Sequence, residues 1–337
     1  MKRVWGLILV VLFSITALAG CGGDKKPAAA PAAPAKVVIA NLPKAVGGAW
    51  FNRMKVGVEK YAQESKVDSF QTGPSKGDSA LQAQSLEDLI SQKVSAITVV
   101  PVAPETLEPI LKKAMAAGII VISHEAAGIK NVNWDVEAFD NAEYGRRFMD
   151  RMGELTKGEG EYAVTVGSLT AKSHMEWADG LVARQKDKFP KMKLVTTQYV
   201  ESGYNQQTSY QRTMELIKKY PNLKGVFCAS ATDLPGAALA IEEASKVNQI
   251  VLVGNGLVSA NKDYIKSGAI KAMSFWDPAD AGYVMSKVAH LLVQKKQVKE
   301  GDDLGVKGYE KVKIVGNIIQ GQAWIDVTKD NVDKFTF

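Results

Sequence analysis

Two residues suited to chemistry stand side by side in the stretch ISHEAAG, where His124 and Glu125 follow a run of aliphatic residues. A histidine followed by a glutamate opens the pattern H-E-x-x-H, in which two histidines one helical turn apart bind zinc and the glutamate acts as a general base. Here the fifth position is Gly128, and the aliphatic run before the pair is typical of a strand. Because the chain has only three histidines, we expect no catalytic metal and no other cofactor.

Other enzyme signatures are absent from the sequence or incomplete. No G-x-S-x-G elbow of a serine hydrolase occurs. The run from Gly254 to Ser259 follows an expected strand and has Asp277 about 20 residues on, but it lacks the third glycine of a dinucleotide-binding fingerprint. Glu125 and Asp233 could form the carboxylate pair of a glycoside hydrolase, which requires a fixed separation that a sequence does not give. That alternative stays open.

The elements that must position these residues alternate regularly from Lys36 onward. Valine- and isoleucine-rich runs, apolar on both faces, alternate with amphipathic segments of helical period, as a parallel sheet covered on both sides requires. The predicted fold class is therefore α/β, doubly wound. Strands are expected at 36–42, 67–72, 94–100, 118–124, 161–167, 193–199, 223–229, 249–254, 270–276 and 313–321. Helices are expected near 50–64, 78–92, 105–116, 141–156, 174–188, 205–219, 235–246 and 279–295.

The alternation falls into two series, one ending at Asp140 and one starting at Glu161, which predicts two lobes. A single sheet of this many strands is less economical, since hydrophobic cores stop growing at about this chain length. Helix 279–295 and the late strand imply that the chain crosses between lobes again before it ends. We expect residues 36–139 plus 277–312 to form lobe 1, and residues 140–276 plus 313–337 to form lobe 2.

A cleft is expected where the carboxyl ends of the strands converge, because ligands of open parallel sheets bind there. The polar and aromatic residues after those ends are the expected ligand-binding set: Lys44, Trp50, Phe51, His124, Glu125, Ser168, Ser173, His174, Ser230, Thr232, Asp233, Asn255, Trp276 and Asp277. Aromatic faces combined with carboxylates, an amide and a lysine suit a polyhydroxylated ligand. Trp50 and Phe51 could instead be core packing, and Asp277 before Pro278 could be a helix N-cap.

The first residues have the features of a targeting segment. Lys2 and Arg3 precede an apolar run, and Leu18-Ala19-Gly20-Cys21 resembles the lipobox of bacterial lipoproteins. We expect residues 1–20 to be a lipoprotein signal peptide, Cys21 to be lipidated, and the alanine- and proline-rich residues 21–35 to be a flexible tether. The alternative is a transmembrane anchor, but the run is shorter than the roughly 20 residues of a span. The protein would then be anchored to a membrane without spanning it.

Cysteine content and charge limit the remaining possibilities. Cys228 is the only other cysteine, so no intramolecular disulfide is available once Cys21 is lipidated, and the fold depends on its core. Removal of Lys2 and Arg3 with the leader lowers the formal net charge from +6 to +4. A charge this small and scattered argues against nucleic acid as a partner.

Several blocks of the sequence resemble the type I periplasmic sugar-binding proteins that serve ABC importers. They are VIANLPKAVGGAWF, QAQSLEDLISQKVSAITVVPVAPETLEPILKKAMAAGIIVI, FDNAEYG and CASATDLPGAALAIEEA, and the likeness covers residues 36–337. The segments SFWDPADAGY and GNIIQGQAWIDVTKDN are similar to the autoinducer-2-binding and rhamnose-binding branch. The resemblance implies two lobes joined by a three-segment hinge, which closes around one monosaccharide-sized ligand.

The resemblance carries over unevenly at the ligand site. Lys44 matches the lysine that the autoinducer-2 proteins use, and Glu125 replaces their aspartate, with His124 in place of a tryptophan before it. In lobe 2, Ser173 and His174 replace an aspartate and a glutamine, while Trp177 is retained. The proline and alanine of the autoinducer-2 proteins fall on Ala229 and Ala231, and the asparagine-aspartate pair and aspartate of sugar-binding relatives become Ser230-Ala231 and Gly256. These differences favour a pentose, hexose, deoxysugar or polyol over autoinducer 2.

The sequence as a whole predicts the solute-binding component of a carbohydrate ABC importer. It would be non-enzymatic and monomeric, held outside the cytoplasm by a lipid anchor, with an ABC permease in the membrane as its partner. An autoinducer-2-binding protein of the same transporter class is the alternative, and a glycoside-acting enzyme is a more remote one.

Overall fold

A computed structural model describes residues 36–126 and 128–337 of the chain. The predicted signal peptide, the tether and the lipidation site at Cys21 lie outside the described residues. In the described part of the chain, no helix is both long enough and apolar enough to cross a membrane.

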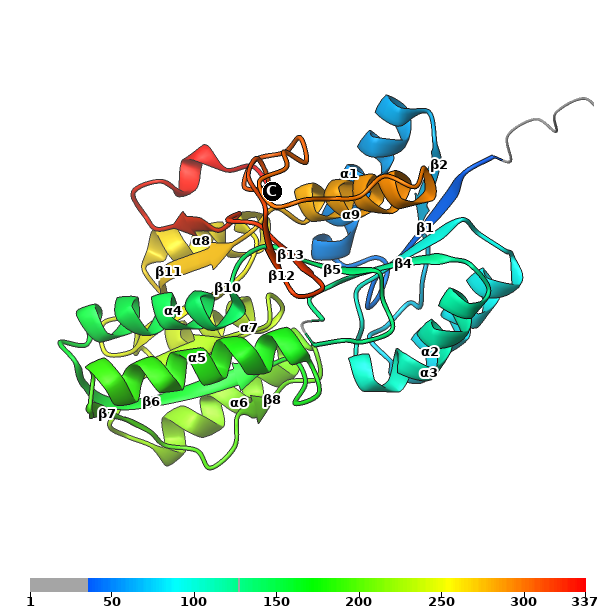
Figure 1. Ribbon diagram of the computed structural model, residues 1–337. Coiled ribbons are helices and arrows are strands. Elements are labelled where there is room, and N and C mark those ends of the chain that lie inside the picture. The colour runs from blue at the N-terminus through cyan, green and yellow to red at the C-terminus, as the bar shows by residue number, and fades with distance from the viewer. Residues whose placement is uncertain (1–35, 127) are drawn as a thin grey trace, which may run out of the picture. The chain divides into compact units, whose positions relative to one another are not determined.

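The first sheet, which defines lobe 1, has the strand order β12-β13-β5-β4-β3-β1-β2. Its strands are β1 (Val38–Leu42), β2 (Asp68–Gln71), β3 (Ala96–Val99), β4 (Ile120–His124), β5 (Trp134–Glu137), β12 (Lys313–Val315) and β13 (Ile318–Gln320). Helices α1 (Ala49–Ser65) and α9 (Pro278–Val293) cover one face, and α2 (Ser79–Ser91) and α3 (Pro104–Ala116) cover the other. Figure 1 shows α1 and α9 side by side. All pairs are parallel except β12 with β13.

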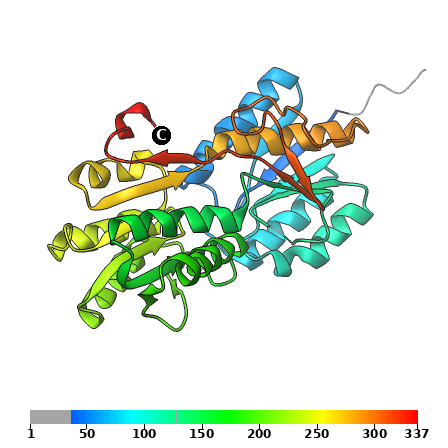
Figure 2. The ribbon, with the colours of Figure 1, turned by 60° about the vertical axis from the view of Figure 1, so that its left-hand side comes forward.

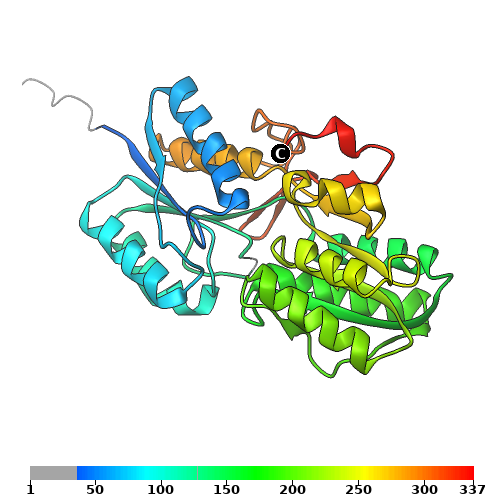
Figure 3. The same cartoon turned by 180° about the vertical axis from the view of Figure 1, so that it is seen from behind.

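The second sheet, which defines lobe 2, has the order β14-β11-β10-β9-β6-β7, with β8 paired to β6. Its strands are β6 (Glu159–Val166), β7 (Lys191–Leu194), β8 (Val200–Glu201), β9 (Leu223–Cys228), β10 (Val251–Asn255), β11 (Ile270–Phe275) and β14 (Ile325–Val327). Helices α4 (Asn141–Leu155) and α5 (Lys172–Lys188) pack together on one face, and α6 (Gln206–Lys219), α7 (Asp233–Glu243) and α8 (Val258–Ser267) on the other. A 3-10 turn, η1 (Val332–Lys334), follows β14. The α6 and α7 pair is seen in Figure 3.

Three chain segments connect the two sheets. They are residues 138–140 between β5 and α4, 276–277 between β11 and α9, and 321–324 between β13 and β14. Two doubly wound lobes with parallel sheets are the fold class that the sequence predicts, and the prediction is confirmed.

The third connection corrects the predicted course of the chain. The late strand expected at 313–321 is a hairpin, β12 and β13, whose second strand pairs with β5 of the first sheet (Figure 2). Gly316 has a φ of 63° at its turn, a conformation that suits glycine in a two-residue hairpin loop. Residues 313–320 therefore belong to lobe 1, whereas the prediction of 313–337 placed them in lobe 2.

Other elements also differ from the expectations. β5, α8 and β14 were not expected, and of the strand expected at 193–199 only residues 193–194 are in a strand, β7, while β8 lies beyond its end. β5 contains two carboxylates, Asp135 and Glu137, and α8 is short and polar. Neither therefore has the apolar pattern on which the strand and helix predictions depend.

The hydrophobic core is continuous through the connecting segments. One cluster joins the α1 and α9 face of lobe 1 to the α4 and α5 face of lobe 2 through Phe139 and Trp276. Each lobe has a second cluster on its other face, against α2 and α3 in lobe 1 and against α7 and α8 in lobe 2. The connections are thus part of the packed interior.

Candidate ligand-binding site

A cavity of about 600 Å³ opens at the carboxyl ends of the strands of both sheets. Of the expected ligand-binding residues, the following line it: Lys44, Trp50, Phe51, Glu125, His174, Ser230, Thr232, Asn255 and Trp276. Small-molecule sites in proteins usually have volumes of roughly 300–1,000 Å³. The strand-end rule therefore brings most of the expected set together in a cavity of suitable size.

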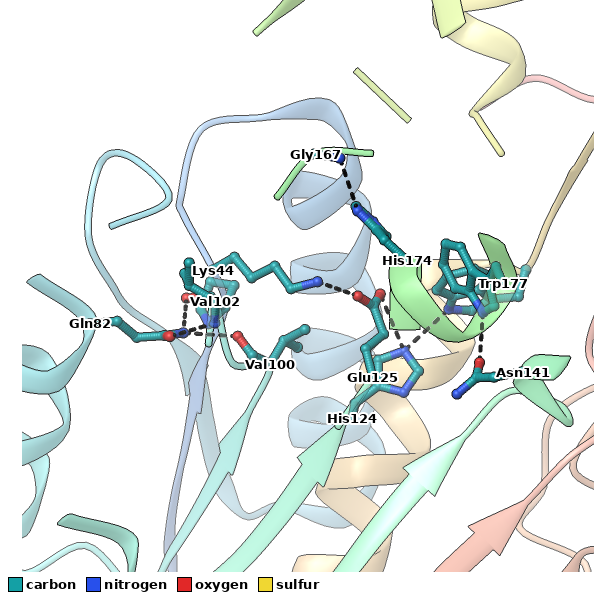
Figure 4. A network of polar contacts seen from close by, with 12 residues as sticks. Lys44, Gln82, Val100, Val102, His124, Glu125, Asn141, Gly167, His174 and Trp177 are labelled. Atoms are coloured by element: carbon teal, nitrogen blue, oxygen red, sulfur yellow. Dashed lines mark hydrogen bonds and ion pairs between the residues drawn. The ribbon is translucent and has the colours of Figure 1, made fainter. Parts of the chain in front are cut away.

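Lys44 and Glu125 form an ion pair in the wall of this cavity (Figure 4). Lys44 Nζ lies 2.5 Å from Glu125 Oε2, and each side chain is only 6% exposed. Burial lowers the pKa of Lys44, but the charge of Glu125, the hydrogen bond to Glu125 and the charges of Tyr204 and Glu137 together outweigh burial, and the pKa is raised. Burial likewise favours protonation of Glu125, yet Lys44 holds the pKa of that carboxyl below its usual value. Both groups are therefore charged, and the ammonium keeps further N–H donors for a ligand.

The backbone holds Glu125 in an uncommon conformation. Its φ is 56°, in the left-handed region that residues other than glycine seldom adopt. This turn directly after β4 directs the carboxylate toward Lys44, which follows β1. Uncommon backbone conformations of this kind cluster at ligand sites, where surrounding contacts compensate for their cost.

His174, at the start of α5, contributes a neutral imidazole from lobe 2. The backbone N–H of Gly167 donates to His174 Nδ1 at 3.2 Å, so the ring proton is on Nε2. Burial, and secondly the charge of Lys44, lower the pKa of His174 to about 3. The ring is therefore uncharged at physiological pH, and its Nε2–H is a donor beside the cavity.

Asn255 and two hydroxyls supply further neutral groups from lobe 2. The hydroxyl of Tyr144 donates to Asn255 Oδ1 at 3.1 Å, which leaves the amide N–H groups of Asn255 for a ligand. Ser230 Oγ and Thr232 Oγ1 lie 2.8 Å apart and share one hydrogen bond. Because their remaining lone pairs and second proton are unused by that bond, these side chains can accept from and donate to ligand hydroxyls.

Three tryptophans form the aromatic wall. The rings of Trp50 and Trp276 meet edge to face with centroids 4.7 Å apart, and Trp276 meets Trp177 in the same way at 5.6 Å. Trp177 Nε1–H donates to Asn141 Oδ1 at 2.7 Å, as Figure 4 shows. The C–H faces of a ring-shaped polyol pack on surfaces of this kind.

Five residues of the expected set do not line the cavity. Asp233 is fully buried and accepts hydrogen bonds from the hydroxyls of Thr165 and Ser202 at 2.9 and 2.6 Å. Ser173 is buried within α5, and Ser168 bonds to Thr170 in its own loop. Asp233 and Ser173 are thus buried inside lobe 2, whereas Ser168 lies in an exposed loop.

Asp277 and His124 do not line the cavity either, because other residues of the protein bind their side chains. Asp277 caps α9 by accepting from the N–H of Ala279, and both of its oxygens bind Arg53, at 2.9 and 2.6 Å. His124 is fully buried behind Trp276. Asp277 therefore has the N-cap role that the sequence suggested, and both of its carboxylate oxygens bind groups of the protein itself.

The cavity also contains residues outside the expected ligand-binding set, of which the resemblance had pointed only to Trp177 and Ala231. They are Ala45, Val46, Gly48, Ala49, Ser75, Lys76, Gly77, Trp177, Gly203, Tyr204, Asn205, Gln206, Ala231, Pro235, Leu257 and Ala260. Tyr204 follows β8, whose end lies beyond the strand expected at 193–199, and its buried hydroxyl has no partner among the described residues. A side chain at Gly167 would come within 2.4 Å of the Tyr204 ring, so this glycine makes room for it. The strand-end rule applied at Glu201 and Gln71 would have found these loops.

The geometry bears on the enzyme alternatives. In the described part of the chain, no group of three or more histidine, cysteine, aspartate or glutamate side chains could hold a metal ion. Glu125 lines the cavity but Asp233 does not, so these two carboxylates do not face a common ligand.

Comparison with known proteins identifies the family. The family model for the periplasmic binding protein domain matches residues 39–297, most of the chain. The protein belongs to this family. The match confirms the resemblance found in the sequence. Since the family consists of periplasmic binding proteins, the protein is extracytoplasmic.

Curated relatives cover most of the binding protein. The D-allose-binding periplasmic protein of Escherichia coli K12 is 26% identical over 282 residues, which is 80% of this chain and 87% of the relative. The D-ribose/D-allose-binding protein of Pseudomonas aeruginosa is 24% identical over 251 residues, 71% of this chain and 76% of the relative. Both relatives are named as binding proteins.

Solved structures share the fold at lower identity. A solute-binding protein of an ABC transporter from Clostridium phytofermentas, with bound L-rhamnose, has a TM-score of 0.82 at 20% identity and covers 89% of this chain and 98% of its own. LsrB from Clostridium saccharobutylicum in complex with AI-2 also has a TM-score of 0.82, at 18% identity, over 89% of this chain and all of its own.

Proposed function

We propose that this binding protein is the solute-binding component of a carbohydrate ABC importer and captures a monosaccharide-like ligand between its lobes. The observation that carries the proposal is the cavity itself, which is lined from both sheets by three tryptophans, the Lys44–Glu125 pair and the neutral donors of lobe 2. Curated relatives named for allose, ribose and xylitol support a sugar, deoxysugar or polyol.

The polar groups suit neighbouring hydroxyls of one ring. Lys44 donates and Glu125 accepts from adjoining positions 2.5 Å apart, so two vicinal hydroxyls can each find the complementary partner. His174 Nε2–H and the Asn255 amide can donate to hydroxyl or ring oxygens on the other side. Because each lobe supplies part of the set, a ligand gains its full contacts only when both lobes engage it, which favours closure.

The same arrangement supports capture without chemistry. A retaining or inverting glycosidase needs two carboxyl groups facing one bond, and Asp233 is buried away from the cavity that Glu125 lines. A non-enzymatic, monomeric protein with a lipid at Cys21, which delivers its ligand to an ABC permease, fits the family and the lipobox-like leader.

A thermal-shift screen of the full-length protein tests the function. The panel contains D-ribose, D-allose, D-xylose, L-rhamnose, D-arabinose, xylitol and autoinducer 2, and we expect one sugar or polyol to raise the melting temperature in a concentration-dependent way. Trp50→Ala is the matched control. It removes part of the aromatic wall of the cavity at a half-buried position, so the same compound should raise its melting temperature less. No shift with any member of the panel would contradict the proposal.

Autoinducer 2 is the second candidate ligand. It is favoured by one observation, the cavity position of Lys44, the residue that resembles the ligand-binding lysine of the autoinducer-2 proteins. The screen separates the two ligands, since a receptor for autoinducer 2 responds to that compound without borate and to none of the sugars.

A further inference from the structure

Trp276 lies in the connection between β11 and α9 and lines the cavity. Its indole N–H donates to Nε2 of His124, the last residue of β4, at 3.2 Å. Trp276 is 1% exposed and His124 is fully buried, so water does not compete for this bond. The contact joins a connecting segment to lobe 1.

The second nitrogen of His124 fixes which form of the ring can make this bond. Nδ1 lies 2.5 Å from the carbonyl oxygen of Val136, its register partner on β5. A carbonyl only accepts and an indole N–H only donates, so Nδ1 must carry the proton and Nε2 must be bare. The neutral Nδ1–H tautomer satisfies both partners, whereas protonation would set an N–H against the N–H of Trp276.

We propose that His124 is a positioning residue, which holds the Trp276 wall of the cavity in place and does so only in its neutral form. This proposal rests on the proposed function for its effect on binding, but not for the hydrogen bond itself. His124 acts through Trp276, since it does not line the cavity. Trp276 in turn meets Trp50 and Trp177, so a shift of its ring disturbs the whole aromatic wall.

Charged groups face His124 from two strand ends. Glu125 Oε1 lies 3.9 Å from Nε2, and Asp135 of β5 is within electrostatic reach. Lys44 and His174 lie beyond Glu125 (Figure 4). These charged groups all remain when only the imidazole is replaced, so a variant at His124 isolates the contribution of its ring.

The ligand-free test is the side-chain resonance of Trp276 in full-length protein with 15N-labelled tryptophan, assigned by Trp276→Phe. In His124→Leu we expect the resonance to move upfield and its exchange with water to become about tenfold faster, as for one lost hydrogen bond. In His124→Gln, which keeps an acceptor, part of the protection should return. An unchanged resonance in His124→Leu overturns the proposal.

The binding test is a double-mutant cycle with the panel compound that gives the largest thermal shift. His124→Leu should weaken binding about tenfold in the parent and have no further effect in Trp276→Phe, where the indole N–H is gone. Equal losses in both backgrounds would mean that His124 acts independently of Trp276. If no compound binds, the proposed function fails, while the Trp276 resonance still decides the positioning role.

Discussion

The two lobes each place an acidic residue just after a central strand, Glu125 after β4 and Asp233 after β9, and they use these residues in opposite ways. Glu125 lines the cavity, paired with Lys44, and its pKa is lowered. Asp233 is buried among hydroxyls, and burial raises its pKa to about 6. A carboxylate at a strand end is thus a ligand candidate only where a cation keeps it ionised and it faces the cavity.

The two lobes also differ in the charge of the groups that they place in the cavity. Lobe 1 supplies the ion pair, whereas the groups from lobe 2 described above, His174, Asn255, Ser230 and Thr232, are uncharged. A neutral ligand therefore meets a fixed dipole on one side and adaptable donors and acceptors on the other.

The largest effect is expected at the ion pair. Glu125→Gln leaves Lys44 charged and unpaired in the wall, so we expect unfolding free energy to fall by about 3 kcal/mol and ligand binding to be lost. Urea unfolding without ligand measures the first effect. The double variant Lys44→Met with Glu125→Leu should lose much less stability than the two single losses added. A cost below about 1 kcal/mol for Glu125→Gln would remove the contrast with Asp233.

Asp233 should instead affect stability through pH. Its folded-state pKa is raised, so its contribution is fully present below about pH 4, the value of an unfolded aspartate, and is lost as pH rises through about 6. Relative to Asp233→Asn, the parent should therefore lose about 2–3 kcal/mol of stability between pH 4 and pH 8. Urea unfolding of both proteins across that range is the measurement. Binding by Asp233→Asn should remain near parental, and a large loss would place Asp233 in the site.

Asp277 is a third strand-end carboxylate, and it tests the same rule at smaller scale. Asparagine still caps helices well, so Asp277→Asn should cost about 1 kcal/mol through the lost bidentate pair with Arg53, which is partly exposed. Asp277→Ala should cost about 2 kcal/mol because the cap of α9 is lost as well. Thermal unfolding of the two variants gives the difference. Equal costs would show that the cap contributes nothing.

The smallest effect is expected at His174. His174→Gln keeps one donor, so binding should weaken by about 1 kcal/mol. Because the pKa of His174 is lowered to about 3, this ring stays neutral between pH 5 and pH 8, and the ratio of parent to variant affinity should be constant across that range. Calorimetric titrations at both ends check this. A ratio that changes severalfold would show that His174 takes up a proton.

Much of this site could be predicted from the sequence, because apolar runs of period two and 3.6 locate strands and helices, and parallel sheets bind ligands at one edge. This rule locates Lys44, Glu125, His174 and Trp276 at the edge where the cavity lies. The direction in which a side chain leaves a strand end could not be predicted, since it depends on one turn of backbone. Glu125 reaches Lys44 through a positive φ, and Asp233 opens α7 and turns inward.

The remaining cavity residues and elements were not predicted because the boundaries of the expected strands and helices were wrong. Tyr204 was missed because β8 is only two residues long and ends beyond the expected strand. Leu257 and Ala260 were missed because α8 is short and polar. The hairpin β12–β13 was taken for one strand, although Gly316-Asn317 between two apolar runs is a turn signal that could have divided it.

The pairing of β5 with β13 suggests that the first sheet is completed after the central strands of the second. The two strands lie almost two hundred positions apart in sequence, with most of lobe 2 between them. Strands β6 to β11 are consecutive in the chain, so the central sheet of lobe 2 can form as soon as they are available. The edge of lobe 1 stays open until Ile318–Gln320 arrive. We expect this closure to be a late and slow event, since long loops must be ordered before such contacts form, and a chain that stops before β13 would expose β5 as a free edge open to aggregation.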